Sequence, residues 1–157
     1  MSIISLVVSV TRPGLKTSVN AWIPVVLWAA VIFWGSHQQD LPKDQVVPFI
    51  EWLCRFLRIS TETAITVTGH FVEYAVLGYF LRRGLILQYP GRVTIPLLPG
   101  YGNEIVAAFI IGTLYALTDE YHQSFVPGRV PSLFDIATDL LGLAVGIFIH
   151  RAVSNEK

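Results

Sequence analysis

The chain has 157 residues, of which 53% are hydrophobic and only 14% are charged. Soluble domains usually carry about 25% charged residues, so the composition indicates a membrane protein. The length suits a single domain over residues 1–157. The formal net charge is zero, which predicts no nucleic-acid partner, and the lone Cys54 excludes an internal disulfide and a cysteine-based metal cluster.

Four segments are long and apolar enough to be expected to cross a bilayer as helices. A hydrocarbon core of about 30 Å needs roughly 20 mostly apolar helical residues. The predicted spans cover approximately residues 19–36, 62–81, 104–120 and 133–150. The sequence therefore predicts an all-α, polytopic membrane protein built as a bundle of four transmembrane helices.

Two flanking segments are apolar but too short to span. Residues 1–10 are followed by Thr11-Arg12-Pro13-Gly14, which breaks the apolar run. We expect residues 1–10 to form an interfacial helix or a disordered start. Within residues 45–58, apolar residues recur at helical spacing and charged residues lie largely apart from them. This pattern predicts an additional amphipathic helix, either lying in the membrane interface or packed on the bundle as a lid.

The distribution of basic residues predicts the orientation, because cytoplasmic loops carry an excess of Lys and Arg. If the N-terminus, the 82–103 loop and the C-terminus share one side, that side holds seven basic residues: Arg12, Lys16, Arg82, Arg83, Arg92, Arg151 and Lys157. The other side holds four: Lys43, Arg55, Arg58 and Arg129. Both termini are therefore expected in the cytoplasm. The best single support is Arg82-Arg83, which directly follows the second predicted span.

With this topology, the ionisable side chains of the last three spans converge at the extracytoplasmic end of the bundle. They are His70 and Glu73 in the second span, Asp119 and Glu120 at the end of the third, and Asp135 and Asp139 at the start of the fourth. The cytoplasmic halves of the helices, in contrast, look apolar and closed. The sequence thus predicts a polar site at one end only.

The charges at this end are unbalanced. A charged side chain at a helix centre costs about 2.5–3.5 kcal/mol on insertion scales. Arg129 is the one permanent cation close in sequence to five carboxylates. Some of the acids must therefore be protonated, reached by water or neutralised by a bound cation.

Structural explanations also remain open for these residues. Asp119 and Glu120 could simply sit in water at a helix end, and Asp135 could complement a helix dipole. His70 and Glu73 could form a structural pair. Arg129 could bind a carboxylate or phosphate of a ligand, pair with Asp119 or Asp135 to fix the turn, or do both.

Small residues continue the acidic face of the fourth span. Asp135, Asp139, Gly142 and Gly146 follow i, i+4, i+7 and i+11, which is one stripe along a helix. Gly142 and Gly146 form a G-x-x-x-G pattern, which lets another helix approach closely. The two aspartates are therefore expected to face protein rather than lipid.

The segments HFVEYAVLGYFL (70–81) and TDEYHQSFVPGRVPSLFDIATDLLGLAVG (118–146) together resemble the VanZ-like family. The family pattern is met by His70, Glu73, Tyr74, Asp119, Glu120, Gln123, Phe125, Pro127, Gly128, Arg129, Ser132, Asp135, Gly142 and Gly146, and by Ser36 after the first span. Asp139 departs from it, since the family usually has Asn there. The resemblance implies a small polytopic membrane protein of the bacterial cytoplasmic membrane, from a family whose founding member is linked to teicoplanin resistance.

Three functions follow from these residues. The first is binding of a cell-envelope lipid, a lipid-linked precursor or a lipophilic glycopeptide antibiotic, with Ser36, Tyr74, Glu120, Gln123, Arg129 and Asp139 as binding residues. The second is an enzyme acting on a lipid or envelope substrate, with His70, Glu73, Asp119 and Asp135 as catalytic residues. The third is a small proton-coupled transporter, for which four spans are few, although a homodimer could supply more.

No cofactor is predicted, because no dedicated ligand motif such as H-E-x-x-H occurs. A divalent metal stays open under the enzyme hypothesis. Its candidate ligands are Glu73, Asp119 and Asp135.

Overall fold

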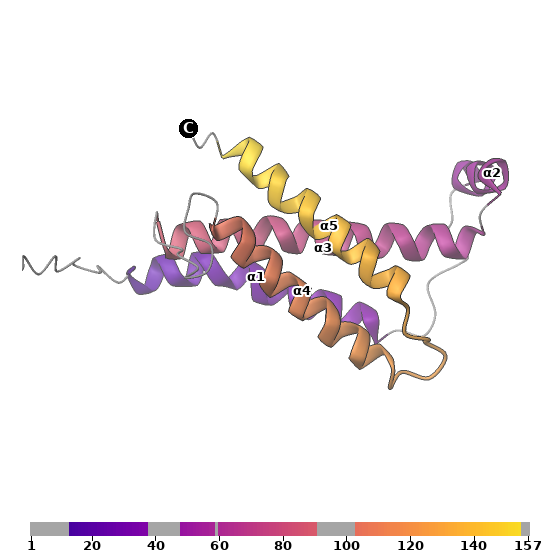
Figure 1. Ribbon diagram of the computed structural model, residues 1–157, viewed down its shortest axis with the longest axis horizontal. Helices are drawn as coiled ribbons and strands as arrows, with labels where there is room; N and C mark the ends of the chain where they lie inside the picture. Colours follow the sequence, from indigo (N-terminus) through magenta and orange to yellow (C-terminus); the bar gives the residue numbers. More distant parts are fainter. Residues whose placement is uncertain (1–12, 38–47, 59, 91–102, 155–157) are drawn as a thin grey trace, which may run out of the picture.

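A computed structural model describes residues 13–37, 48–58, 60–90 and 103–154, and within these ranges the chain is helical without strands. The helices are α1 (Leu15–Ser36), α2 (Pro48–Leu57), α3 (Thr61–Gln88), α4 (Asn103–Gln123) and α5 (Leu133–Val153) (Figure 1). The predicted all-α fold is confirmed.

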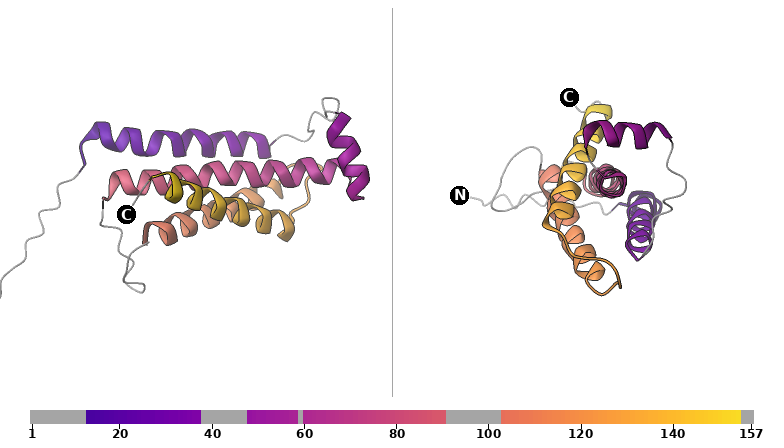
Figure 2. Two further views of the ribbon diagram at one scale, coloured as in Figure 1. Left: turned by 90° about the horizontal axis from the view of Figure 1, so that it is seen from above. Right: turned by 90° about the vertical axis from the view of Figure 1, so that its right-hand side faces the viewer.

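Helix α3 is the centre of the molecule, since it packs against each of the other four helices. Successive long helices run in opposite directions, so the start of α1 and the end of α5 lie at one end of the bundle (Figure 1). We call this the terminal end. The opposite end carries α2 and the 124–132 connector between α4 and α5, and we call it the connector end. Helix α2 lies across the end of α3 rather than along it (Figure 2).

Three of the helices, α1, α3 and α5, are long and apolar enough to cross a membrane. Helix α4 has 21 residues but is more polar at its two ends, where it carries Glu104, Asp119 and Glu120. By length and composition, the described residues therefore provide three candidate spans rather than the four predicted.

The boundaries of α3 show that one prediction was wrong. Helix α3 has 28 residues and continues to Gln88, so Arg82 and Arg83 lie inside it and not in a loop that begins at residue 82. Arg82 is only 1% exposed. The helix does not end at these two arginines because each finds hydrogen-bond acceptors on a neighbouring helix: Arg82 on α4 and α5, and Arg83 on Asn20 of α1.

The predicted amphipathic segment forms a helix over Pro48–Leu57, and residues 45–47 lie outside the described ranges. Trp52 and Phe56 stack on each other and are strongly exposed, whereas Cys54 is buried. Arg58 ends the helix in the left-handed conformation, with φ of 56°. The expectation for residues 1–10 also falls outside the described residues.

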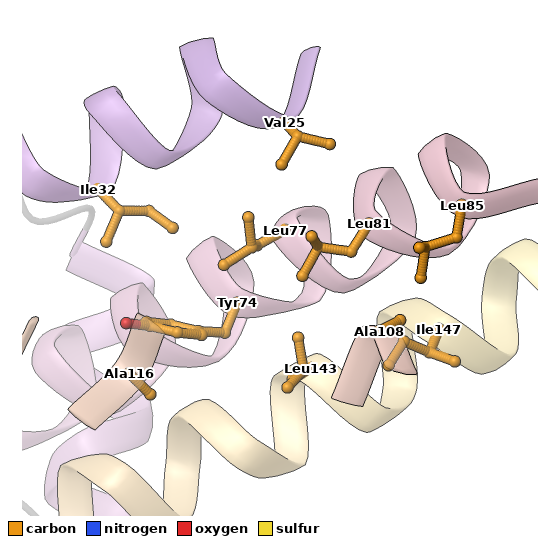
Figure 3. Packing of buried hydrophobic residues seen from close by; sticks show 10 residues of the cluster. All are labelled: Val25, Ile32, Tyr74, Leu77, Leu81, Leu85, Ala108, Ala116, Leu143 and Ile147. Atoms are coloured by element: carbon orange, nitrogen blue, oxygen red, sulfur yellow. The ribbon is translucent and has the colours of Figure 1, made fainter. Parts of the chain in front are cut away.

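The apolar core surrounds the inner part of α3, where Leu77 and Leu81 belong to one cluster with Val25 and Ile32 of α1 and with Leu143 and Ile147 of α5 (Figure 3). Gly142 and Gly146 allow this packing. A Cβ added at Gly142 would lie 2.2 Å from the backbone oxygen of Phe71, and one at Gly146 would lie 1.7 Å from that of Ala75. The two helix backbones therefore touch along this stripe.

Candidate functional site

Asp119, near the end of α4, joins three helices at the connector end. Asp119 is a buried residue, with only 4% of its surface exposed. The Oδ2 atom accepts hydrogen bonds from Ser36 of α1 at 2.9 Å, from Gln123 at 3.3 Å and from Tyr74 of α3 at 3.5 Å. The Oδ1 atom has no hydrogen-bond partner in the part of the chain that the structure describes. The structure thus brings Ser36, Tyr74 and Gln123 around one buried acid and leaves one oxygen of that acid free to accept.

His70 of α3 and Asp139 of α5 form a second buried contact at this end. The Nδ1 atom of His70 lies 2.9 Å from Oδ1 of Asp139, and both side chains are almost completely buried. Because a carboxylate oxygen accepts, the Nδ1–H of His70 donates in this pair. His70 is therefore paired with Asp139 on another helix rather than with Glu73 on its own.

Replacing Asp139 by Ala is expected to lower the free energy of unfolding by about 1–3 kcal/mol, because it leaves the Nδ1–H of His70 buried without an acceptor. Asp139→Asn keeps an acceptor oxygen and is expected to cost less than about 1 kcal/mol. Thermal unfolding in detergent, followed by circular dichroism, would compare the two. Equal losses for both variants would show that the charge of Asp139, and not its hydrogen bond, holds the pair.

Glu73 is a residue of α3, and its side chain lies beside α1. Its Oε1 atom is 3.5 Å from the position that a Cβ of Gly35 would take, and its backbone oxygen accepts from the indole Nε1 of Trp28 at 2.8 Å. Tyr115 of α4 donates to the backbone oxygen of Ala29 at 2.6 Å, which ties α4 to the same stretch of α1. These contacts place the half-buried carboxyl group of Glu73 beside a glycine, where there is room for it.

Glu120, Asp135 and Arg129 lie where α4, the connector and α5 meet. Glu120 is 6% exposed, and its Oε1 accepts from the backbone N–H of Ser132, the N-cap of α5. Its Oε2 has no partner within the described ranges. Asp135 is half-buried in the first turn of α5. Among the described residues, Arg129 forms no ion pair with Asp119 or Asp135, and its buried Nε has no partner. Of the alternatives left open for Arg129, the pairing with one of these acids to fix the turn is therefore not seen among the described residues.

The turn itself is built at Gly128, which has a φ of 84°, a conformation that favours glycine. Nearby, the ring of His122 stacks on Phe33 at a centroid distance of 4.3 Å and on His37 at 5.6 Å. His37 is exposed and His122 half-buried. These two histidines link the end of α4 to the end of α1.

The candidate metal ligands Glu73, Asp119 and Asp135 do not form a ligand set. Within the described part of the chain, no group of three or more His, Cys, Asp or Glu side chains is arranged to hold a metal ion. The chemistry that these residues offer is hydrogen bonding and charge, from buried carboxylates and one guanidinium.

A second polar cluster lies at the terminal end, where the sequence analysis predicted only apolar helix halves. Arg82 donates to Nδ1 of His150 at 2.8 Å, to Oε1 of Glu104 at 3.3 Å and to Oγ of Ser154 at 3.4 Å. This terminal-end cluster joins α3, α4 and α5. The sequence could have predicted this cluster, because Arg82, Glu104 and His150 lie at a similar depth at the same end of their helices. It was not predicted because Arg82 was assigned to a loop.

A known protein family matches most of the chain. The family model described as VanZ/LLP1 matches residues 21–154, a range that contains both polar clusters and all but the first turns of α1. No curated protein and no solved structure matches the chain significantly. Because the family match covers most of the chain and three of the described helices are candidate membrane spans, the chain is a membrane protein that belongs to the VanZ/LLP1 family.

Proposed function

We propose that this protein binds a membrane amphiphile of the bacterial cell envelope at the connector end of the bundle. The classes of ligand are a lipid, a lipid-linked precursor or a lipophilic glycopeptide. The observation that supports this proposal is a pair of buried carboxylate oxygens, Oδ1 of Asp119 and Oε2 of Glu120, that have no hydrogen-bond partner among the described residues. A buried polar atom that lacks a partner costs free energy, which a ligand donor would recover.

The proposal includes the topology. The protein lies in the bacterial cytoplasmic membrane with both termini in the cytoplasm, so the connector end faces outward. Helix α4 is the fourth span, which is supported by its exposed apolar side chains Ile110, Ile111, Leu114 and Leu117. Helix α2 lies in the outer interface in this proposal, which is supported by the exposed side chains of Trp52 and Phe56, because aromatic side chains are favoured there.

Asp119→Asn and Glu73→Gln test the binding function. Each removes a negative charge and nearly preserves side-chain volume, and each is expected to weaken binding of the ligand about tenfold, because a hydrogen bond to a charged group contributes about 1.5–3 kcal/mol. The measurement is the affinity of protein in lipid nanodiscs for teicoplanin, for a lipid-linked precursor and for envelope lipids.

Glu62→Gln is the matched control, since it makes the same charge change on an exposed residue at the same end of α3. Its affinity should equal that of the wild type. Unchanged binding in both site variants would overturn the proposal. Conversion of a bound compound to a product would replace binding by catalysis as the function.

A further inference from the structure

The connector between α4 and α5 and the helix turns beside it expose mainly apolar side chains. Five exposed residues there are aliphatic or aromatic: Tyr121, Phe125, Val130, Leu133 and Phe134. Val130 is 81% exposed and Leu133 is 85% exposed. Arg129 is the only charged residue between 124 and 132. An exposed apolar surface of this kind marks contact with a membrane or with another molecule.

This apolar surface continues the lipid-facing sides of the two helices that the connector joins. On α4, one face carries three exposed side chains at i, i+3 and i+7, namely Leu114, Leu117 and Tyr121. On α5, a candidate membrane span, one face carries three exposed side chains at i, i+7 and i+14, namely Phe134, Leu141 and Phe148. The faces that meet lipid along the helices therefore reach the connector.

Helix α3 extends farther at the connector end than the helices that the connector joins. His70 is nine residues from the start of α3, which is about 14 Å along the helix axis. Its partner Asp139 is only six residues from the start of α5, which is about 9 Å along an oblique axis. Figure 1 shows α3 reaching past the ends of α1, α4 and α5 to α2. With α2 in the membrane interface, the connector lies deeper in the membrane than α2.

The backbone of the connector leaves few N–H groups for water. Pro127 and Pro131 have no N–H. Five other N–H groups donate within the protein, those of Ser124, Phe125, Val126, Arg129 and Ser132. Among the described residues, this leaves only the N–H groups of Gly128 and Val130 without an acceptor. Backbone groups without partners are costly in an apolar environment, whereas a loop in water needs no such internal hydrogen bonds.

We infer that the connector is embedded in the lipid leaflet at the connector end, at the boundary between headgroups and acyl chains. Its partner is the lipid layer itself, which Phe125, Val130 and Leu133 contact. A single arginine fits this depth, because long basic side chains extend toward the headgroups. This placement rests on the proposed function for the position of α2. It adds that the segment bonded to Glu120 through Ser132 is bathed by lipid and not by bulk water.

A fluorescent label at residue 130 tests this placement. Cys54 is the only cysteine, so Cys54→Ala gives a background without thiols, and Val130→Cys then carries the label in nanodiscs. Iodide in the water is expected to quench this label about fivefold less than a label at Arg55→Cys, because a charged quencher is excluded from apolar surroundings. Arg55 is the matched control, since its side chain lies on α2 at the same end and is 82% exposed.

Lipids that carry a doxyl group near the headgroup are expected to quench the label of Val130→Cys strongly. Leu133→Cys repeats both measurements at a second exposed position and keeps the test decisive where the first variant folds poorly. Equal iodide quenching in Val130→Cys, Leu133→Cys and Arg55→Cys would overturn the inference. Protection from iodide without quenching by doxyl lipids would also overturn it, because protein, such as a second copy of the chain, would then cover the connector.

The result is independent of ligand binding, since no ligand is added and iodide reaches both faces of a nanodisc. A connector that iodide reaches freely, together with weakened ligand binding in Asp119→Asn and Glu73→Gln, would remove this inference and leave the proposed function standing. A shielded connector, together with unchanged binding in those two variants, would do the reverse.

Discussion

Gly146→Ala is expected to destabilise the protein by about 2 kcal/mol. The added Cβ would lie 1.7 Å from the backbone oxygen of Ala75 and 2.6 Å from its carbonyl carbon, so the backbones of α3 and α5 would have to separate. Overpacking a well-packed contact typically costs about 1–3 kcal/mol, and backbone atoms have no rotamer that relieves the contact. This loss must exceed the gain of about 1 kcal/mol that Ala brings over Gly inside a helix.

The measurement for this prediction is thermal unfolding in detergent, with Gly69→Ala as the matched control. Gly69 is also inside a helix, but a Cβ added there meets nothing within 4 Å. Its replacement should leave the melting temperature unchanged or raise it. A melting temperature of Gly146→Ala equal to that of Gly69→Ala would mean that α3 and α5 are farther apart than described.

Arg82→Met is expected to cost about 3 kcal/mol or more of stability. Arg82 is 1% exposed, and its loss removes the hydrogen bonds to Glu104 and His150. Removing one partner of a buried ion pair costs about 3–5 kcal/mol, because the remaining charge stays uncompensated. The side chain of Glu104 is 23% exposed, so water partly hydrates its charge. We therefore expect a cost near the lower end of the range of about 3–5 kcal/mol.

A double-mutant cycle with Glu104→Gln separates the ion pair from the loss of packing, with unfolding followed in detergent. Once Glu104 is neutral, Arg82→Met should cost clearly less than in the wild type. Arg83→Met is the neighbouring control. Among the described residues, Arg83 donates hydrogen bonds only to Asn20, at the more exposed side of α3, and its replacement should cost less than about 1 kcal/mol. Equal costs at both arginines would contradict the buried network.

The sequence predicted the convergence of polar residues at the connector end, because the direction of each span fixes the depth of every residue on it. It did not predict which residues pair. The partner of His70 depends on how α3 and α5 are rotated about their axes, and this rotation is set by the contacts of Gly142 and Gly146 with α3. The hydrogen bond between Ser36 and Asp119 likewise depends on packing between α1 and α4.

The terminal-end cluster was missed for a different reason. Treating Arg82 as a loop residue follows from the high cost of an arginine in a span, and that cost assumes that no partner is present. Glu104 and His150 supply partners from two other helices. The number of predicted spans depends in the same way on whether charged residues at a helix end have partners, because α4 is apolar in its middle and polar at both ends.

The central position of α3 also fixes how deep the two polar clusters lie in a bilayer. His70 and Arg82 are twelve residues apart on one continuous helix, which is about 18 Å along its axis. A hydrocarbon core of about 30 Å would then extend roughly 6 Å beyond each of these residues when the helix is upright and centred. A thinner bilayer would bring both polar clusters closer to water at the same time. Membrane thickness therefore changes the hydration of the two ends of the protein together.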